Sequence, residues 1–175
     1  MTKAANERLA KIKMLVMDVD GVLTDGGILV YADGSESKRF HVQDGAWLRI
    51  WRRQGLKTAI ITGRTCPAVA YRAADLEVDY VYQGTIEKGA TLEELVQESG
   101  VAVEEMAYIG DDIFDLPVLR RVGYPAAVAN AIGLIKEAAD YVTRTKGGEG
   151  AVAELIRHLL RQKGLWEQAV ERYYK

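Results

Sequence analysis

The sequence predicts an α/β fold, a three-layer Rossmann-like parallel sheet with helices on both faces, a β-hairpin flap and no large cap domain. Short apolar runs of strand length alternate with segments of helical spacing, which is typical of parallel strands joined by helices. One hairpin-like segment interrupts this alternation after the first apolar run, where a larger cap domain could otherwise be inserted. The 175 residues, 49% of them hydrophobic, suffice for the core of one ordinary domain.

The expected strands are short and apolar, as parallel strands buried on both faces should be. In chain order they are Met14 to Met17, Thr58 to Ile61, Tyr80 to Tyr82, Met106 to Ile109 and Ala126 to Ala129. Helical spacing is found in Trp47 to Gln54, Pro67 to Leu76, Glu87 to Ser99, Ile113 to Val122 and Gly133 to Ala139. We expect residues 1–175 to form one domain that ends in a helix and tail at about 149–175, interrupted at Gly164 because glycine is a poor helix former.

The expected flap spans about residues 27–42. Ile28 to Tyr31 and Glu36 to Val42 are strand-like runs joined through Ala32-Asp33-Gly34-Ser35, and an Asp-Gly pair is a strong hairpin signal. Because this hairpin follows the acidic loop of the first strand, we expect it to overhang the functional site. The alternative is a surface hairpin that serves only packing or assembly.

Charge and hydropathy argue against several classes of partner. The 23 basic and 25 acidic residues nearly cancel, so no overall field favours nucleic acid or an anionic membrane surface. No apolar run approaches the roughly 18 residues of a membrane span, and Met1 to Ile12 lacks the apolar stretch of a secretory signal. The single cysteine, Cys66, agrees with a reducing compartment. We therefore expect a cytoplasmic protein that binds neither nucleic acid nor membrane.

Two acidic clusters follow expected strands. Asp18 and Asp20 come directly after the first strand, and Asp111 and Asp112 come after the strand that ends at Ile109. Ligands of open α/β sheets bind at the carboxyl edge of the strands, where these acids would meet. Alone, the second cluster could simply cap the next helix. Two acidic strand ends in one short chain instead favour a cation, and hard oxygen ligands suit Mg²⁺.

Two further strand exits carry groups suited to phosphate. Thr62-Gly63-Arg64 follows an apolar strand, and its hydroxyl, backbone amides and following helix N-terminus would cradle phosphate oxygens. An isolated Thr-Gly would be read as a turn and helix cap. Lys88 lies near the start of the helix after Tyr82. Most lysines are solvated surface charges, but a place at a fourth strand exit favours a role in the site.

These residues together resemble the signature of a known family. Asp18-x-Asp20-Gly21-x-x-Thr24, Thr62, Lys88 and Gly110-Asp111-x-x-x-Asp115 are similar, in order and spacing, to the four motifs of haloacid dehalogenase superfamily phosphatases. The resemblance extends from about Lys13 to the last helix. Within the superfamily, the 3-deoxy-D-manno-octulosonate 8-phosphate phosphatases are resembled by Asp18 to Gly26, Gln43-Asp44-Gly45, Ile61 to Arg64, Tyr82-Gln83-Gly84, Ile109 to Asp112, Asp115 to Leu119 and Gly147 to Gly150.

The resemblance implies a role for each motif. Asp18 would be the nucleophile that forms an aspartyl-phosphate, and Asp20 the general acid and base. The resemblance also implies a Mg²⁺ cofactor, phosphoryl-binding groups and residues that orient the metal's waters and the lysine. The implied metal ligands are Asp18, the backbone carbonyl of Asp20 and Asp111; the implied phosphoryl-binding residues are Thr62 and Lys88; and the implied supporting residues are Asp112 and Asp115.

The implied substrate is a small sugar-acid phosphate. Its carboxylate calls for a cation beside the phosphoryl site, and Gly63, Arg64 and Arg72 complete the candidate binding set with Thr62 and Lys88. Arg64 favours the eight-carbon acid, because relatives that act on nine-carbon sialic-type acids tend to carry Glu at this position. The alternatives are such a nine-carbon substrate, a catalytically silent assembly or regulatory module, and a phosphotransferase or dehalogenase of the same fold. The resemblance also implies a homotetramer in which Ile28 to Val42 is interfacial.

Overall fold

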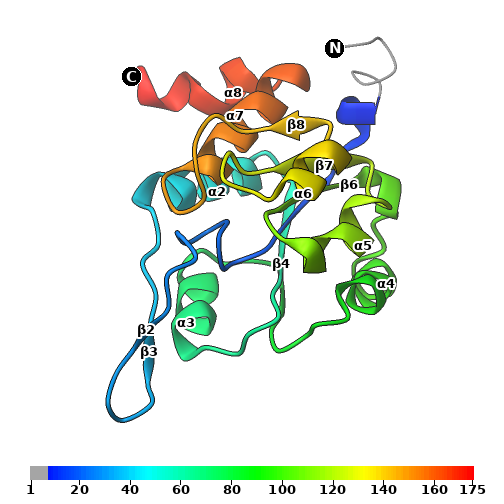
Figure 1. The fold of residues 1–175 in the computed structure, drawn as a ribbon. Coiled ribbons are helices and arrows are strands. Elements are labelled where there is room, and N and C mark those ends of the chain that lie inside the picture. The colour runs from blue at the N-terminus through cyan, green and yellow to red at the C-terminus, as the bar shows by residue number, and fades with distance from the viewer. Residues whose placement is uncertain (1–7) are drawn as a thin grey trace.

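A six-stranded parallel sheet forms the centre of the computed structural model, which describes residues 8–175 (Figure 1). The strand order is β5-β4-β1-β6-β7-β8, and every neighbouring pair is parallel. In chain order the strands are β1 (Met14–Met17), β4 (Lys57–Ile61), β5 (Tyr80–Tyr82), β6 (Met106–Gly110), β7 (Tyr124–Ala127) and β8 (Tyr141–Val142). The expected parallel α/β fold is therefore confirmed.

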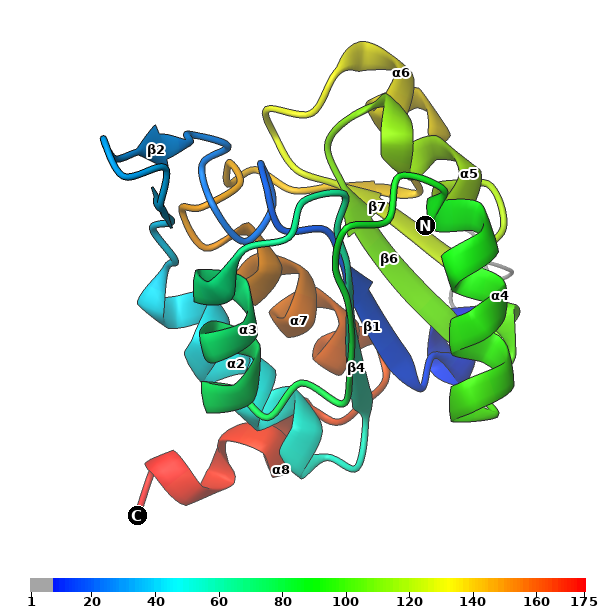
Figure 2. The ribbon, with the colours of Figure 1, turned by 90° about the horizontal axis from the view of Figure 1, so that it is seen from below.

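Helices cover both faces of this sheet. Figure 2 shows α2, α3 and α7 on one side and α4 and α5 on the other. This division follows from right-handed crossovers, because the chain moves outward from β1 to β5 and then returns past β1 to β6. The helices are α2 (Val42–Arg53), α3 (Pro67–Asp75), α4 (Lys88–Ser99), α5 (Leu116–Leu119), α6 (Gly133–Ala138), α7 (Ala151–Gln162) and α8 (Trp166–Val170), with short 3-10 turns η1 (Val103–Glu105), η2 (Ile113–Asp115) and η3 (Glu171–Tyr173).

Several expected boundaries were wrong. The helix expected at Ile113 to Val122 is the 3-10 turn η2, which begins at a capping box formed by Asp112 and Asp115, followed by the short α5. Strand β7 starts at Tyr124 rather than Ala126, and it includes Pro125, a residue that usually argues against a central strand. The two-residue strand β8 was missed, since two residues show no periodicity.

The hairpin is shorter than expected. Its strands are β2 (Leu29–Val30) and β3 (Glu36–Ser37), paired antiparallel, and they extend away from the body of the molecule in Figure 1. The second strand was expected to reach Val42, but α2 already begins there. Asp44 explains this early start, because an acidic side chain in the first turn favours the helix dipole.

Part of the buried core lies where the sheet meets α2 and α7. Trp51, Leu48 and Leu155 are fully buried, as are all four residues of β1. Asp44 links the two helices through a buried hydrogen bond, in which its Oδ1 accepts from the Ala153 amide at 2.7 Å. Burial raises the pKa of Asp44 to about 6. Within residues 8–175, no helix combines the length and apolarity needed to cross a bilayer.

Truncation of Leu155 tests this packing. We expect Leu155→Ala to lower the free energy of unfolding by about 2–5 kcal/mol, because it leaves a cavity in a fully buried site. Urea unfolding followed by circular dichroism measures the change. Leu134→Ala on α6 is the matched control: Leu134 is 40% exposed, so the same truncation should cost much less. Equal losses in the two variants would contradict this account of the core.

Candidate functional site

The register of the sheet brings three motifs to one edge. Met17, the last residue of β1, is paired with Ile60 of β4 and Ile109 of β6. The chain therefore leaves these adjacent strands at neighbouring points, into the loops that carry Asp18, Thr62 and Asp111. Ladder pairing of Ile61 with Tyr82 brings the exit of β5, and with it Lys88, to the same edge. Segments far apart in the sequence converge here because parallel strands end at a common edge.

A cavity of about 390 Å³ lies at this edge. Nine of the ten residues expected in the site line it, so the tertiary structure brings four separate motifs together. The expected lining residues are Asp18, Asp20, Thr62, Gly63, Arg64, Lys88, Asp111, Asp112 and Asp115, and Ile86 and Phe114 add apolar surface.

Lys88 joins the acidic loops through a buried network. Its Nζ lies 2.9 Å from Asp18 Oδ1 and 2.7 Å from Asp115 Oδ1. Its side chain is only 3% exposed, and nearby carboxylates keep an ammonium charged in such a place. Although burial opposes the charge, the two carboxylates raise the pKa of Lys88 above its ordinary value. Lys88 is therefore a buried positive charge among the residues that line the cavity.

Asp115 supports the site without being free to bind a metal. Its Oδ1 accepts from Lys88 and from the Tyr108 hydroxyl at 2.6 Å. Its Oδ2 accepts from the amides of Asp111, at 2.7 Å, and Asp112, at 3.2 Å. These four hydrogen bonds occupy both carboxylate oxygens, so Asp115 orders the lysine and the second acidic loop.

Asp18 and Asp111 are better placed to hold a cation. One carboxylate oxygen from each lies within 4.8 Å of the other and of an Asp115 oxygen. Asp111 Oδ1 is buried without a hydrogen-bond partner among the described residues, which is unfavourable unless a ligand satisfies it. Oxygen donors of this kind suit Mg²⁺, so the residues present fit the expected metal. The Asp20 carbonyl, in the same loop, is the third expected donor.

The electrostatics of the cluster point the same way. Burial raises the pKa of Asp18, with Asp115 adding to the rise and Lys88 opposing it. Burial, reinforced by the charges of Asp18 and Asp115, raises the pKa of Asp111 to about 7. The Asp111 carboxylate can lie against the first acidic loop because residue 21 is glycine. A Cβ at this position would overlap the carboxylate, and the φ of +90° at Gly21 also favours glycine.

Thr62 and Arg64 also line the cavity. Thr62 is held by backbone hydrogen bonds, its amide donating to Tyr82 O at 3.0 Å and its carbonyl accepting from Thr85. The guanidinium of Arg64 forms an ion pair with Glu36 of the hairpin. The hairpin therefore contacts the loop that carries Thr62 and Arg64 directly.

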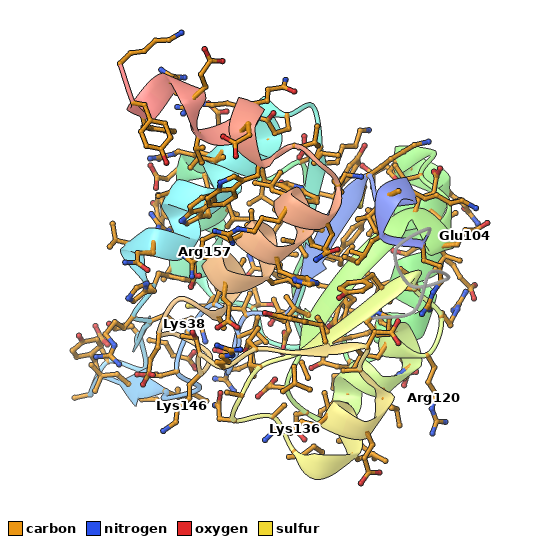
Figure 3. The ribbon with its side chains drawn as sticks, turned by 90° about the horizontal axis from the view of Figure 1, so that it is seen from above. Lys38, Glu104, Arg120, Lys136, Lys146 and Arg157 are labelled. Carbon is orange, nitrogen blue, oxygen red and sulfur yellow. The ribbon has the colours of Figure 1, made fainter. Side chains whose placement is uncertain are left out.

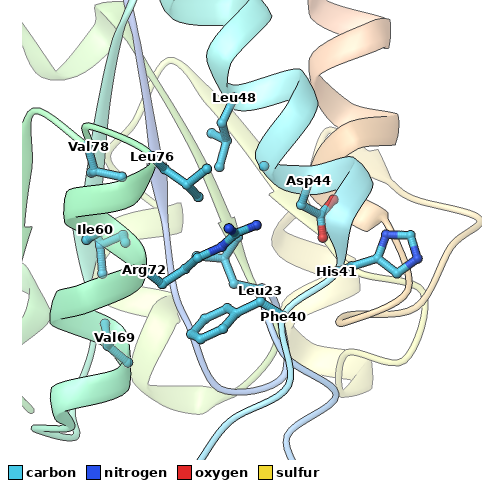
Figure 4. Close-up of a pocket in the computed structure, with 12 residues that line it drawn as sticks. Leu23, Phe40, His41, Asp44, Leu48, Ile60, Val69, Arg72, Leu76 and Val78 are labelled. Carbon is cyan, nitrogen blue, oxygen red and sulfur yellow. The ribbon is translucent and has the colours of Figure 1, made fainter.

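Arg72 is the one expected site residue that the structure places elsewhere. Figure 4 shows it directed toward Phe40 and Asp44, between α3 and α2. Its guanidinium bonds Asp75 at 2.7 Å and lies 5.9 Å from the centre of the Phe40 ring. The enclosed space around it is about 10 Å³, room for about one water molecule and not for a sugar acid. Sequence alone could not show that Arg72 lies on the inner side of α3.

Sequence reasoning also missed two polar residues of the site. Tyr108 is fully buried on β6, and its hydroxyl bonds Asp115. Lys38, just after β3, forms an ion pair with Asp20. Tyr108 could have been suspected as an aromatic residue two positions before Gly110. Nothing in the local sequence indicates which acid Lys38 would reach.

Comparisons with known proteins agree with this geometry. Residues 80–156 match the family model described as haloacid dehalogenase-like hydrolase. The chain is 42% identical over 169 residues to the 3-deoxy-D-manno-octulosonate 8-phosphate phosphatase KdsC of Escherichia coli, covering 97% of this chain and 87% of that protein.

Two solved structures are similar over nearly the whole chain. One is a probable YrbI family phosphatase from Pseudomonas syringae, with a TM-score of 0.95, 41% identity and 99% coverage of both chains. The other is the 3-deoxy-D-manno-octulosonate 8-phosphate phosphatase of Moraxella catarrhalis in complex with magnesium, phosphate and KDO, with a TM-score of 0.95, 34% identity and 99% coverage of both chains. The extent of these similarities, together with the four converging motifs, shows that the chain belongs to the 3-deoxy-D-manno-octulosonate 8-phosphate phosphatase family of haloacid dehalogenase-like hydrolases.

Proposed function

We propose that this chain is a Mg²⁺-dependent phosphatase that hydrolyses 3-deoxy-D-manno-octulosonate 8-phosphate to the free sugar acid and phosphate, in lipopolysaccharide sugar biosynthesis. One observation carries the proposal: Asp18, Lys88 and Asp111 converge in one cavity of a chain that is 42% identical to a phosphatase of this specificity. A catalytically silent module would not need to keep a buried, mutually repelling acidic cluster. The proposal therefore includes the full set of reacting groups.

Asp18 is the proposed nucleophile. Its carboxylate oxygen bonds to phosphorus while the bond from phosphorus to the sugar oxygen breaks. The electron pair of that bond goes to the sugar oxygen, which takes a proton from Asp20. In the second step Asp20 takes a proton from water, the water oxygen bonds to phosphorus, and Asp18 is released with the electron pair. Asp20 ends as it began, and the net reaction consumes one water.

Lys88 and Thr62 are the proposed phosphoryl-binding groups. Two of the three ammonium protons of Lys88 point to Asp18 and Asp115, and its third contact is a long one of 3.4 Å to Tyr108. The third ammonium proton, which makes only this long contact, is available to a phosphoryl oxygen. Asp18, Asp111 and the Asp20 carbonyl are the proposed metal donors, and Asp112 would orient metal-bound water. A bound Mg²⁺ supplies positive charge that offsets repulsion between the carboxylates and the phosphate.

Arg64 and Gly63 are the proposed contacts for the sugar-acid portion of the substrate. Arg64 lies on the cavity wall with its side chain 45% exposed, so a ligand can reach the guanidinium. A guanidinium binds a carboxylate in two-point geometry, and the substrate carboxylate would share or replace Glu36 as its partner. Both candidate sugar acids carry a carboxylate, so the preference for the eight-carbon acid rests on the 42% identity to a phosphatase of that substrate.

The hairpin is also the proposed site of assembly into a homotetramer. Ile28, Leu29, Val30 and Tyr31 are 46%, 56%, 60% and 50% exposed, a run of apolar side chains in water on a projecting element. Contiguous exposed apolar surface is typical of an interaction site. Burial against identical hairpins would cover it.

Phosphate release tests the proposed reaction. With Mg²⁺ present, the protein should release phosphate from 3-deoxy-D-manno-octulosonate 8-phosphate with a higher kcat/KM than from a nine-carbon sugar-acid phosphate. Asp18→Asn should lower kcat by at least about 10⁴-fold, because an amide cannot replace the attacking carboxylate. A preference for the nine-carbon ester would overturn the substrate assignment, and an active Asp18→Asn variant would overturn the nucleophile.

Thermal unfolding tests the metal site. The folded pKa of Asp111, about 7 against an ordinary 3.8, means that the folded protein holds more protons than the unfolded chain between these values. In chelator, the contribution of Asp111 to stability should therefore fall as pH rises from about 4 to 8, and the difference in Tm between wild type and Asp111→Asn isolates it. Mg²⁺ requires ionised ligands, so its stabilisation should be larger at pH 8 than at pH 5. When the Mg²⁺ concentration is 100 times its Kd, binding should stabilise the folded protein by about 2.7 kcal/mol, which raises Tm by roughly 5–10 °C.

Asp111→Asn provides the matched control for that measurement. The variant should be more stable than the wild type in chelator at pH 8, because one repelling charge is gone, and should lose most of the Mg²⁺ shift. An unchanged Mg²⁺ shift in Asp111→Asn would remove this residue from the metal site.

Light scattering tests the assembly. At micromolar concentration we expect a mass of four times the 19.4 kDa chain. Val30→Glu places a charge in the exposed apolar run and should reduce the mass, whereas Leu134→Glu on α6 should not. A monomeric wild-type protein would contradict the tetramer.

A further inference from the structure

Lys38 is a buried cation that the reaction described above does not use. Its side chain is 1% exposed, and its Nζ forms an ion pair with Asp20 Oδ1. It lies where the hairpin joins the body of the molecule (Figure 3). Removing an ammonium from water is costly unless a carboxylate compensates, so the burial of Lys38 depends on Asp20.

The ion pair leaves the two oxygens of Asp20 in different situations. Oδ1 is held by Lys38, while Oδ2 is buried and has no hydrogen-bond partner among the described residues. A carboxyl group with one fixed oxygen cannot rotate freely about its terminal torsion. The orientation of Oδ2 is therefore fixed by the ion pair at Oδ1. Because Oδ2 has no hydrogen-bond partner among the described residues, it can carry the proton that passes to the leaving oxygen.

The hairpin presents a second residue on the same side. Glu36 and Lys38 are two positions apart, the spacing of neighbours on one face of an extended segment, and they contact Arg64 and Asp20 respectively. Arg39 differs: it pairs with Asp25 at 2.6 Å with its own side chain 75% exposed. One face of the hairpin stem therefore contacts the cavity, and Arg39 is a cation of the same segment outside it.

We propose that Lys38 is a positioning residue for proton transfer, which holds Asp20 Oδ1 so that Oδ2 faces the leaving oxygen of the substrate. This inference rests on the proposed phosphatase reaction. It adds that the hairpin supplies part of the proton-transfer machinery from within the same chain. Because Lys38 acts through Asp20, its loss should impair the step in which a poor leaving group needs a proton.

Leaving-group dependence separates this role from a merely structural one. An aliphatic sugar-acid phosphate needs its leaving oxygen protonated, whereas the nitrophenolate of p-nitrophenyl phosphate leaves with little help. We expect Lys38→Met to lower kcat about 100-fold on the sugar-acid phosphate, the usual scale of general acid catalysis, with KM nearly unchanged. On p-nitrophenyl phosphate the loss should be below about 10-fold. Lys38→Arg should recover part of the difference.

Arg39→Met is the matched control, because it removes a neighbouring hairpin cation and its ion pair outside the cavity. It should leave the ratio of the two kcat values unchanged. Equal losses on both esters in Lys38→Met, or no loss on either, would overturn the proposal. Any aliphatic phosphate ester that the wild type hydrolyses serves for the comparison, so a wrong substrate assignment is recognised separately.

A thermal double-mutant cycle tests the ion pair without any activity. Asp20→Asn leaves the Lys38 ammonium buried and unpaired, so its Tm should fall further than that of Asp20→Asn combined with Lys38→Met. The same ordering should hold in chelator, where no metal contributes. Additive Tm shifts would show that Lys38 and Asp20 are not coupled, and would overturn the positioning role even if the wild type hydrolysed no ester.

Discussion

The carboxylates of Asp18, Asp111 and Asp115 meet within 4.8 Å at one edge of the sheet, and their mutual repulsion is the constraint on which the site depends. Two kinds of positive charge relieve it. Lys88 is built into the fold, buried and bonded to both Asp18 and Asp115, while a bound cation would complete the balance at Asp111. An anionic phosphate ester can bind among these carboxylates only when positive charge, from Lys88 and a bound cation, offsets their repulsion.

The stability of the sheet is what permits this concentration of charge. The strands that carry the acidic loops, β1 and β6, are buried along their whole length. Their backbone ladders fix where each loop begins, and so set the backbone positions from which Asp18 and Asp111 extend. The apolar core therefore holds the acidic groups in an arrangement that they would not adopt by themselves.

The hairpin, an element outside the core, also places charged side chains against the site. Leu29 and Val30 of β2 are exposed, whereas Glu36 of the paired strand β3 and Lys38 just after it contact Arg64 and Asp20. The same short segment thus carries exposed apolar side chains and charged groups that contact residues lining the cavity. Its ion pairs connect it both to the first acidic loop, at Asp20, and to the loop after β4, at Arg64.

Much of this protein followed from local sequence. Apolar runs followed by Asp18, Thr62 or Asp111 predicted both the parallel sheet and the candidate reacting groups. They could do so because the burial of a strand and the residues at its end both depend on a few consecutive residues. Contacts across the fold had no such local signal. Tertiary packing decided three features. It directed Arg72 away from the cavity, paired Lys38 with Asp20, and filled both Asp115 oxygens with hydrogen bonds. Side-chain partners that are distant in sequence depend on how helices and loops pack on the sheet, so local sequence does not indicate them.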